Sequence, residues 1–281
     1  YTMVYGIAKM LNFAHGDVFM VAGLLMVYLT ASLPIYVSIP LVIVITVLIG
    51  FLIERVAYRP LRTAPRMSVM ISAIGVSYFI QNVSLYITGG LNKNYPAIPW
   101  ISDKVTVLGT DTTRVTVITP IITIVLVVLL VLLINYTKIG MAMRAVSKDF
   151  ETSQLMGIKI NSVISTTFII GTFLAAVGSM LFFTNYPGVV PTSGAMPGLK
   201  AFVAAVFGGI GSIPGAVVGA FIIGICESII KGLDTILIVG GATTQQLGLA
   251  TFSDAFTFVL LIITLVFRPT GIFGEKITDR L

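Results

Sequence analysis

The sequence predicts an all-α protein that crosses a membrane several times. Of its 281 residues, 57% are hydrophobic and only 10% are charged, and the mean hydropathy is +1.04. Soluble domains carry about 25% charged residues, and a soluble chain of this size could not cover so much apolar surface. The apolar segments follow one another with no polar block large enough to fold alone, so we expect a single transmembrane domain over residues 1–281.

The order of the spans follows from stretches of about 20 mainly apolar residues, the length that crosses a bilayer. Residues 1–13 read as the end of a further helix, and we expect that an N-terminal helix precedes them. The stretch Leu199–Ile230 is too long for one ordinary span and short for two, so we expect about eight transmembrane helices, some of them short or broken. The clear candidates are Val18–Leu33, Ile35–Ile53, Met67–Ile87, Val117–Asn135, Val163–Phe183 and Phe252–Phe267.

Lysine and arginine gather in three segments, residues 54–66, residues 136–162 and the tail from Arg268. Cytoplasmic loops carry an excess of these residues, so we expect all three on the cytoplasmic side of the inner (plasma) membrane. The number of crossings then requires residues 199–230 to begin and end outside, which two short helices satisfy and a single span does not. The polar segment 89–114 falls outside, and its alternating Val and Thr residues suggest a short hairpin or loop.

The segment 208–219, GGIGSIPGAVVG, places glycine and proline inside an apolar stretch. Interior glycine costs a helix about 1 kcal/mol relative to alanine, and proline about 3 kcal/mol, so the segment predicts a break between two helices. Gly211, Gly215 and Gly219 recur every four residues, which favours close packing of another helix. Broken helices also lie near transport pathways. The sequence leaves packing and pathway lining open, and the two are compatible.

The apolar segment 67–87 carries one small and polar face at helical spacing. Polar groups inside a membrane almost always face protein or water, so this face either makes hydrogen bonds between helices or forms a wall that contacts a substrate. Its members are Ala73, Ser77, Gln81, Ser84 and Thr88.

Other polar residues have a structural interpretation. Asn12, His15 and Asp17 precede an apolar helix and indicate a turn and cap, in which Asp17 takes the first helical turn. Glu227 lies four residues before Lys231, the favourable order for an ion pair on a helix. With one cysteine, one histidine and no GxxxxGK[ST] loop in the sequence, we expect no metal site, no cofactor, no catalytic residues and no ATP hydrolysis by this chain.

The basic segment 136–162 reads as one or two short helices that Gly157 ends. Such a helix either lies on the membrane surface or inserts its apolar side chains into a groove of a cytoplasmic partner, and the residues alone favour neither. Met143, Val146 and Phe150 are expected to share a face, with Leu155, Met156 and Ile158 following at the end.

Several segments together resemble the permease subunits of high-affinity branched-chain amino acid ABC importers, and the H-type permease in particular. The resemblance covers nearly the whole chain, and residues 89–114 are its least similar part. The segments that carry it are YTMVYGIAKMLNFAHGDVFM, ERVAYRPLR, ISAIGVSYFIQN, RAVSKDFETSQLMGI, LKAFVAAVFGGIGSIPGAVVGAFIIGICES and RPTGIFG.

The resemblance implies a subunit that pairs with a second, related permease. Two cytoplasmic ATPase subunits and an extracytoplasmic binding protein for leucine, isoleucine or valine would complete the importer, with no nucleic acid as partner. Ala145–Ile158 would then be pressed into the ATPase groove, with Phe150 and Met156 as anchors. The residues assigned to this coupling are Ser147, Asp149, Phe150, Glu151, Leu155, Met156, Gly157 and Ile158. The residues assigned to a translocation path are Ala73, Ser77, Gln81, Gly208, Gly209 and Gly211.

Two alternatives stay open, namely another small solute and a transporter that works alone. Permeases for urea and short-chain amides have a similar sequence, and ribose-type sugar permeases are more distant relatives. A secondary transporter or channel would work without ATPase subunits, although the spans lack a well-placed chain of acids and bases for proton coupling. A membrane-embedded enzyme finds no support, because no Ser/His/Asp set or metal cluster is suggested.

Overall fold

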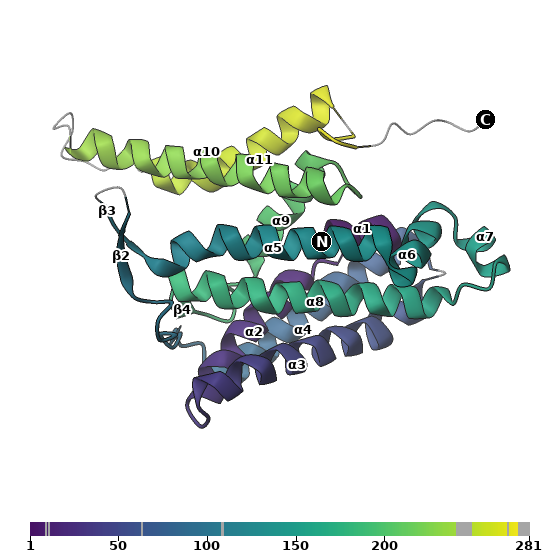
Figure 1. Ribbon diagram of the computed structural model, residues 1–281, viewed down its shortest axis with the longest axis horizontal. Coiled ribbons are helices and arrows are strands. Elements are labelled where there is room, and N and C mark those ends of the chain that lie inside the picture. Colours follow the sequence, from purple (N-terminus) through teal and green to yellow (C-terminus); the bar gives the residue numbers. More distant parts are fainter. Residues whose placement is uncertain are drawn as a thin grey trace. The chain divides into compact units, whose positions relative to one another are not determined.

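The chain is mainly helical in a computed structural model (Figure 1), which confirms the predicted all-α class. It divides into two compact units, one formed by Ile7–Gly198 and the other by Tyr1–Gly6 together with Leu199–Leu281. The residues that the structure describes are 1–8, 10, 12–62, 64–107, 110–239, 249–268 and 270–274.

The larger unit is a bundle in which the long helix α8 packs against α2 and α3. Its core holds Met20 and Met26 of α2, Val42 of α3, and Ala176 and Phe183 of α8. A π-helical turn (Glu54–Tyr58) and a short 3-10 turn (Arg59–Leu61) continue α3. The helices are α2 (His15–Thr30), α3 (Ile35–Ile53), α4 (Arg66–Thr88), α5 (Arg114–Tyr136), α6 (Lys138–Lys148), α7 (Phe150–Leu155) and α8 (Ile160–Asn185).

The two ends of the larger unit differ (Figure 1). One end carries the antiparallel pairs β1 (Lys93–Asn94) with β4 (Gly188–Val189) and β2 (Lys104–Val107) with β3 (Thr110–Thr113), which confirms the hairpin suggested for residues 89–114. The other end carries α6, α7 and the turns after α3. The two basic segments therefore share one end of this unit, as the count of crossings requires.

The smaller unit contains most of α1 (Thr2–Ala8) and α9 (Ala195–Gly208), together with α10 (Ile213–Val239) and α11 (Leu249–Phe267). The last residues of α1 and the first of α9 belong to the larger unit. Its apolar core includes Val203 and Phe207 of α9, Ile223 of α10 and Phe258 of α11. The helix break predicted within 208–219 is confirmed, since α9 ends at Gly208 and α10 begins at Ile213.

One expectation for this break is wrong. The second helix is not short, because α10 has 27 residues and continues to Val239. The apolar run stops at Lys231 and Gly232, but the helix passes through both. Lys231 is accommodated because its ammonium group bonds Glu227 one turn earlier.

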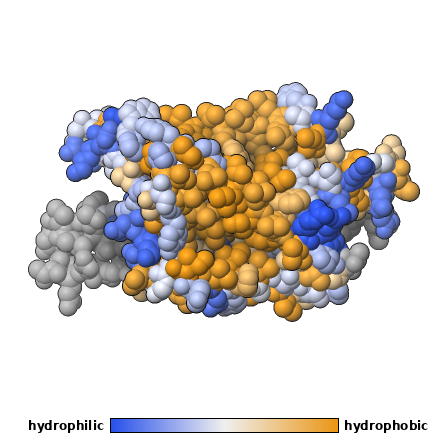
Figure 2. Space-filling view, turned by 90° about the horizontal axis from the view of Figure 1, so that it is seen from below, coloured by the Kyte–Doolittle hydropathy of each residue, from blue (hydrophilic) through white to orange (hydrophobic). Residues whose placement is uncertain are grey.

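By length and composition, five helices in the described part of the chain could cross a membrane, and three shorter apolar helices accompany them. This agrees with the expectation of about eight spans, some short. Val44, Leu48 and Leu52 of α3 are exposed and apolar. Figure 2 shows hydrophobic side chains over the middle of one face and hydrophilic ones toward its two ends, which is the pattern expected of a surface in lipid.

Candidate functional site

Residues 137–159, here called the connecting segment, join α5 to α8. The helix α6 begins where the Thr137 hydroxyl accepts a hydrogen bond of 3.0 Å from the Gly140 N–H. Met143 and Val146 are fully buried, and α6 packs on α5 and α8. The apolar face of α6 is therefore used inside the larger unit. Phe150 does not share it, because Asp149 is extended and ends α6 before α7 begins.

Asp149 caps the start of α7. Its Oδ1 accepts hydrogen bonds from the N–H groups of Glu151 (2.9 Å) and Thr152 (3.2 Å), and its Oδ2 accepts one of 2.5 Å from the Thr152 hydroxyl. These bonds favour the ionised carboxylate, first of all that from the Thr152 hydroxyl, and they hold the pKa of Asp149 below its ordinary value. Sequence analysis placed Asp149 in this segment, but it did not identify the cap.

Gly157 ends α7, as predicted. Its φ angle of 81° lies in the left-handed region that glycine adopts without strain. The Gly157 N–H bonds the Gln154 carbonyl at 3.0 Å, and the Ile158 N–H bonds the Ser153 carbonyl at 3.1 Å. Two carbonyls of the last turn are thus satisfied in the manner typical of a glycine-terminated helix, which fixes the exit of the chain toward α8.

The two large apolar side chains at the end of α7 are exposed. Leu155 is 87% exposed and Met156 is 79% exposed, and α7 projects from its end of the unit (Figure 1). Among the other predicted coupling residues, Glu151 is exposed, whereas Ser147, Phe150 and Ile158 are half-buried. The segment therefore presents a short helix, capped at both ends, whose apolar tip is uncovered in this structure.

Asp17, predicted in the first turn of its helix, contacts the predicted polar face of α4. Its side chain is buried, with the residue 2% exposed. The Asp17 carboxylate accepts hydrogen bonds from the Ser77 hydroxyl and, at 2.9 Å, from Gln81 Nε2. Ala73, Ser84 and Thr88, the rest of the polar face of α4, are also buried. Hydrogen bonding between helices is therefore confirmed for Ser77 and Gln81.

Asn12, His15 and Asp17 form the predicted turn, since the His15 N–H bonds the Asn12 carbonyl at 3.2 Å, but the side chains of Asn12 and Asp17 bond different partners. Asp17 lies in the first turn of α2, as expected, but its carboxylate bonds α4. The Asn12 side chain instead accepts a hydrogen bond of 2.8 Å from the buried Tyr58 hydroxyl. His15 begins α2.

The glycine-rich break of the smaller unit is closely packed. A Cβ atom on Gly215 would lie 2.3 Å from the Gly208 carbonyl oxygen, and one on Gly219 would lie 2.7 Å from the Ala204 carbonyl oxygen. The packing interpretation thus holds for Gly215 and Gly219. Gly211 differs, because it lies in the turn with a φ of 94° and is exposed.

The segment after α11 completes this break. The N–H groups of Ile272 and Phe273 bond the carbonyls of Phe207 and Gly208, each at 3.0 Å. These carbonyls belong to the last turn of α9, which has no helical partner for them. Gly208 and Gly209, two of the predicted path residues, are consequently buried in backbone contacts.

The predicted pair of Glu227 and Lys231 forms, with a distance of 2.6 Å between Oε1 and Nζ. The same Glu227 oxygen contacts Lys200 of α9 at 2.8 Å, and Lys200 also contacts Asp254 of α11 at 2.7 Å. The sequence revealed only the local pair, because the other two residues come from different helices.

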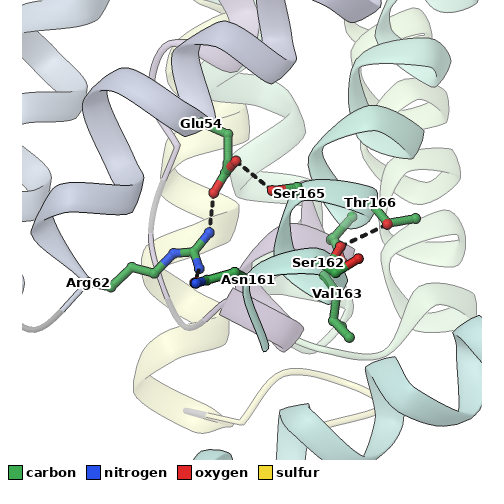
Figure 3. A network of polar contacts seen from close by, with 8 residues as sticks. Glu54, Arg62, Asn161, Ser162, Val163, Ser165 and Thr166 are labelled. Atoms are coloured by element: carbon green, nitrogen blue, oxygen red, sulfur yellow. Dashed lines mark hydrogen bonds and ion pairs between the residues drawn. The ribbon is translucent and has the colours of Figure 1, made fainter. Parts of the chain in front are cut away.

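A buried polar cluster that the sequence did not predict lies at the end of the larger unit that carries the connecting segment (Figure 3). Glu54 is fully buried at the start of the π-helical turn, and Arg62 donates to its carboxylate. Arg62 also donates to Asn161 of α8, and the Ser165 hydroxyl donates to Glu54 at 2.7 Å. The available signal was an acid directly after the apolar run Ile35–Ile53.

Comparison with known proteins agrees with these features. A family model described as the permease component of branched-chain amino acid transport systems matches residues 1–265. The high-affinity branched-chain amino acid transport system permease protein BraD of Pseudomonas aeruginosa is 36% identical over 295 residues, which cover 100% of this chain and 91% of that protein. The corresponding protein LivH of Escherichia coli (strain K12) is 37% identical over 294 residues, with the same coverage.

A more distant relative is the probable branched-chain amino acid transport permease protein LivH of Methanocaldococcus jannaschii, which is 32% identical over 139 residues, or 49% of this chain and 41% of that protein. No solved structure matches the chain. The family model and the two full-length relatives, together with a bundle of apolar helices, show that the chain belongs to the family of permease components of branched-chain amino acid transport systems.

Proposed function

We propose that this chain is the membrane-spanning subunit of an ATP-driven importer that carries leucine, isoleucine and valine into the cytoplasm. The full-length relatives are named as permeases of high-affinity branched-chain amino acid transport, and this supports the substrate class. The chain has no GxxxxGK[ST] loop, so the energy would come from separate ATPase subunits.

The observation that carries the proposal is the exposed tip of α7. Leu155, the last residue of the six-residue helix α7, and Met156, which follows it, are exposed, and Asp149 and Gly157 fix the two ends of this helix. Apolar anchors surrounded by polar residues are typical of side chains that insert into a partner's groove. In this proposal the ATPase subunit binds α7, while α6 stays packed on α5 and α8.

Sidedness and the other partners follow from the same proposal. The end of the larger unit that carries both basic segments would face the cytoplasm, as the excess of lysine and arginine favours. The strand pairs at the opposite end would face the extracytoplasmic binding protein. A second, related permease would complete the membrane part, in the inner membrane.

We also keep a translocation path as part of the proposal. Ionisable residues inside a membrane often mark such paths, and Ser77 and Gln81 hold the carboxylate of Asp17. The buried Ala73 lies on the same face of α4 and leaves little side-chain volume there. In the smaller unit Gly211 stays a candidate, whereas backbone contacts occupy the space beside Gly208 and Gly209. A change of substrate preference on replacement of Ser77 or Gln81 would distinguish a path from packing alone.

The test is uptake by the complete complex in vesicles. We expect ATP-dependent uptake of labelled leucine that isoleucine and valine compete for and urea does not. Leu155→Glu with Met156→Glu should abolish binding of the ATPase subunits and uptake together, whereas Gln154→Glu, an exposed neighbour on α7, should preserve both. Uptake that persists without ATPase subunits, or competition by urea alone, would contradict the proposal.

A further inference from the structure

The buried cluster of Glu54, Arg62, Asn161 and Ser165, here called the Glu54 cluster, joins the end of α3 to the start of α8 (Figure 3). We propose that this cluster is the joint through which movement of the connecting segment reaches α3 and α4, with Asn161 as its positioning residue. This inference rests on the proposed function, because it assigns the route by which an ATPase bound at α7 moves the larger unit.

The inner half of the joint is fixed. A buried carboxylate is costly unless it is paired and hydrogen-bonded, and Glu54 receives bonds from both Arg62 and Ser165. Next to it, the fully buried Tyr58 packs on Phe168 of α8 in a tilted arrangement, with 5.4 Å between ring centroids and 45° between the ring planes. Separation of these groups would leave the carboxylate of Glu54 without a partner, so we expect this half to stay intact when the outer half changes.

The outer half of the joint can be released. Asn161 is exposed, and its amide oxygen accepts a hydrogen bond from the same guanidinium that holds Glu54. If this bond breaks, the exposed Asn161 can bond water instead, and the Arg62 side chain, which is 14% exposed, keeps its pair with Glu54. The Arg62–Asn161 bond therefore costs less free energy to break than the buried Glu54–Arg62 pair beside it. A joint with two positions needs one contact that changes and one that stays.

The Glu54 cluster lies close to α7 along the chain, so a movement of α7 would reach it. Ile158 completes the cap of α7, and α8 begins at Ile160 with Asn161 as its second residue. Movement of α7 therefore reaches Asn161 through a few residues of chain. The π-helical turn that carries Glu54 and Tyr58 is a rare conformation that is common at functional sites.

The other side of the joint leads into the bundle. Arg62 lies shortly before α4, which begins at Arg66. Helix α4 carries Ser77 and Gln81, whose side chains hold Asp17 of α2. A change in the position of Arg62 would thus move α4 and alter the buried polar contact between α4 and α2. Coupling between two distant sites needs an element with two arrangements whose balance each site can shift. In this proposal that element is the Arg62–Asn161 bond, which is either formed or broken.

The experiment compares variants in the reconstituted complex, with uptake and ATP hydrolysis measured in the same vesicles. Asn161→Ala should lower the amount of amino acid transported per ATP by about fivefold, the factor that a net hydrogen bond of about 1 kcal/mol supplies. Binding of the ATPase subunits should stay unchanged. Asn161→Asp, which keeps an acceptor oxygen for Arg62, should retain coupling, and so should Ser162→Ala, the exposed neighbour in Figure 3.

A second readout needs no substrate. With Cys226 replaced by serine, spin labels at Gln154 of α7 and at Tyr86 of α4, which is 90% exposed, report the distance between these helices. ATP should change this distance in the otherwise unaltered chain, and Asn161→Ala should remove most of the change. If Asn161→Ala does not assemble, Arg62→Lys gives the same comparison, because a lysine keeps a positive charge for Glu54 but lacks the fork of donors that also reaches Asn161.

An Asn161→Ala complex that assembles with full transport per ATP and a normal ATP-dependent distance change would overturn the joint. A failure of the proposed function looks different. In that case the unaltered complex transports none of the three amino acids, but the spin labels still respond to ATP and to Asn161→Ala, which would support the joint.

Discussion

Gln81 of α4 donates a hydrogen bond of 2.9 Å to the carboxylate of Asp17 on α2, 64 residues earlier in the chain. Ser77, one turn before Gln81, donates to the other carboxylate oxygen. The polar face of α4 is therefore turned toward α2, and both carboxylate oxygens of a buried acid are satisfied by neutral donors. This contact ties two helices together where apolar packing alone would leave their rotation undefined.

Replacement of Gln81 tests the strength of this contact. Gln81→Leu should lower the free energy of unfolding by about 1–3 kcal/mol, because a buried carboxylate loses a donor. Thermal unfolding of the purified complex in detergent measures the effect. The matched control is Asn82→Leu, since Asn82 is exposed and bonds only the Tyr78 carbonyl of its own helix among the contacts described. Equal stability of the two variants would show that the contact adds little.

The left-handed residue at the end of α7 gives a second prediction. Gly157→Val should cost about 1–2 kcal/mol locally, because a side chain at positive φ is strained, and the strain should displace Leu155 and Met156. We expect lower stimulation of the ATPase by loaded binding protein at normal expression. Gly157→Asn, whose side chain tolerates this conformation, should keep most of the stimulation. Normal stimulation in Gly157→Val would argue against a defined α7 tip.

The cap at Asp149 gives a prediction about pH. Its pKa is lowered by the hydroxyl and N–H bonds it accepts, so the cap stabilises α7 fully above the ordinary Asp pKa of about 3.9. This contribution should be lost as the pH falls below that value and through the lowered pKa of the folded state. The protection of the Glu151 and Thr152 amides from hydrogen exchange, taken relative to the intrinsic rate at each pH, should fall over this range. In Asp149→Ala this protection should be low at every pH.

The glycines of α10 provide a matched pair. Gly215→Ala should destabilise the protein by about 1–3 kcal/mol, because its Cβ would lie 2.3 Å from the Gly208 carbonyl oxygen. Gly224 lies on the same helix with nothing within 4 Å of its Cβ position, so Gly224→Ala should be neutral or stabilising by up to about 1 kcal/mol. Unfolding of both variants under the same conditions decides the point, and a stable Gly215→Ala would refute the close contact.

Several features were predictable because they depend on residues close together in the chain. The lengths of the apolar runs located the spans, and glycine and proline located the break between α9 and α10. Gly157 ends a helix, and Glu227 pairs with Lys231, through contacts within one or two turns. The end of α10 was misjudged for a related reason, since a lysine that pairs within its own helix does not interrupt it.

The sequence by itself thus determined the membrane class, the approximate positions of the helices, the glycine that ends α7 and the Glu227–Lys231 pair. The tertiary structure alone decided which faces meet: Asp17 with Gln81, Glu54 with Arg62 and Asn161, and Lys200 with Glu227 and Asp254. The physical reason lies in the solvent. A helix in lipid is apolar on the packed side and on the lipid side alike, so its hydrophobic pattern cannot tell which side faces a neighbour, and only the assembled bundle brings these distant polar groups together.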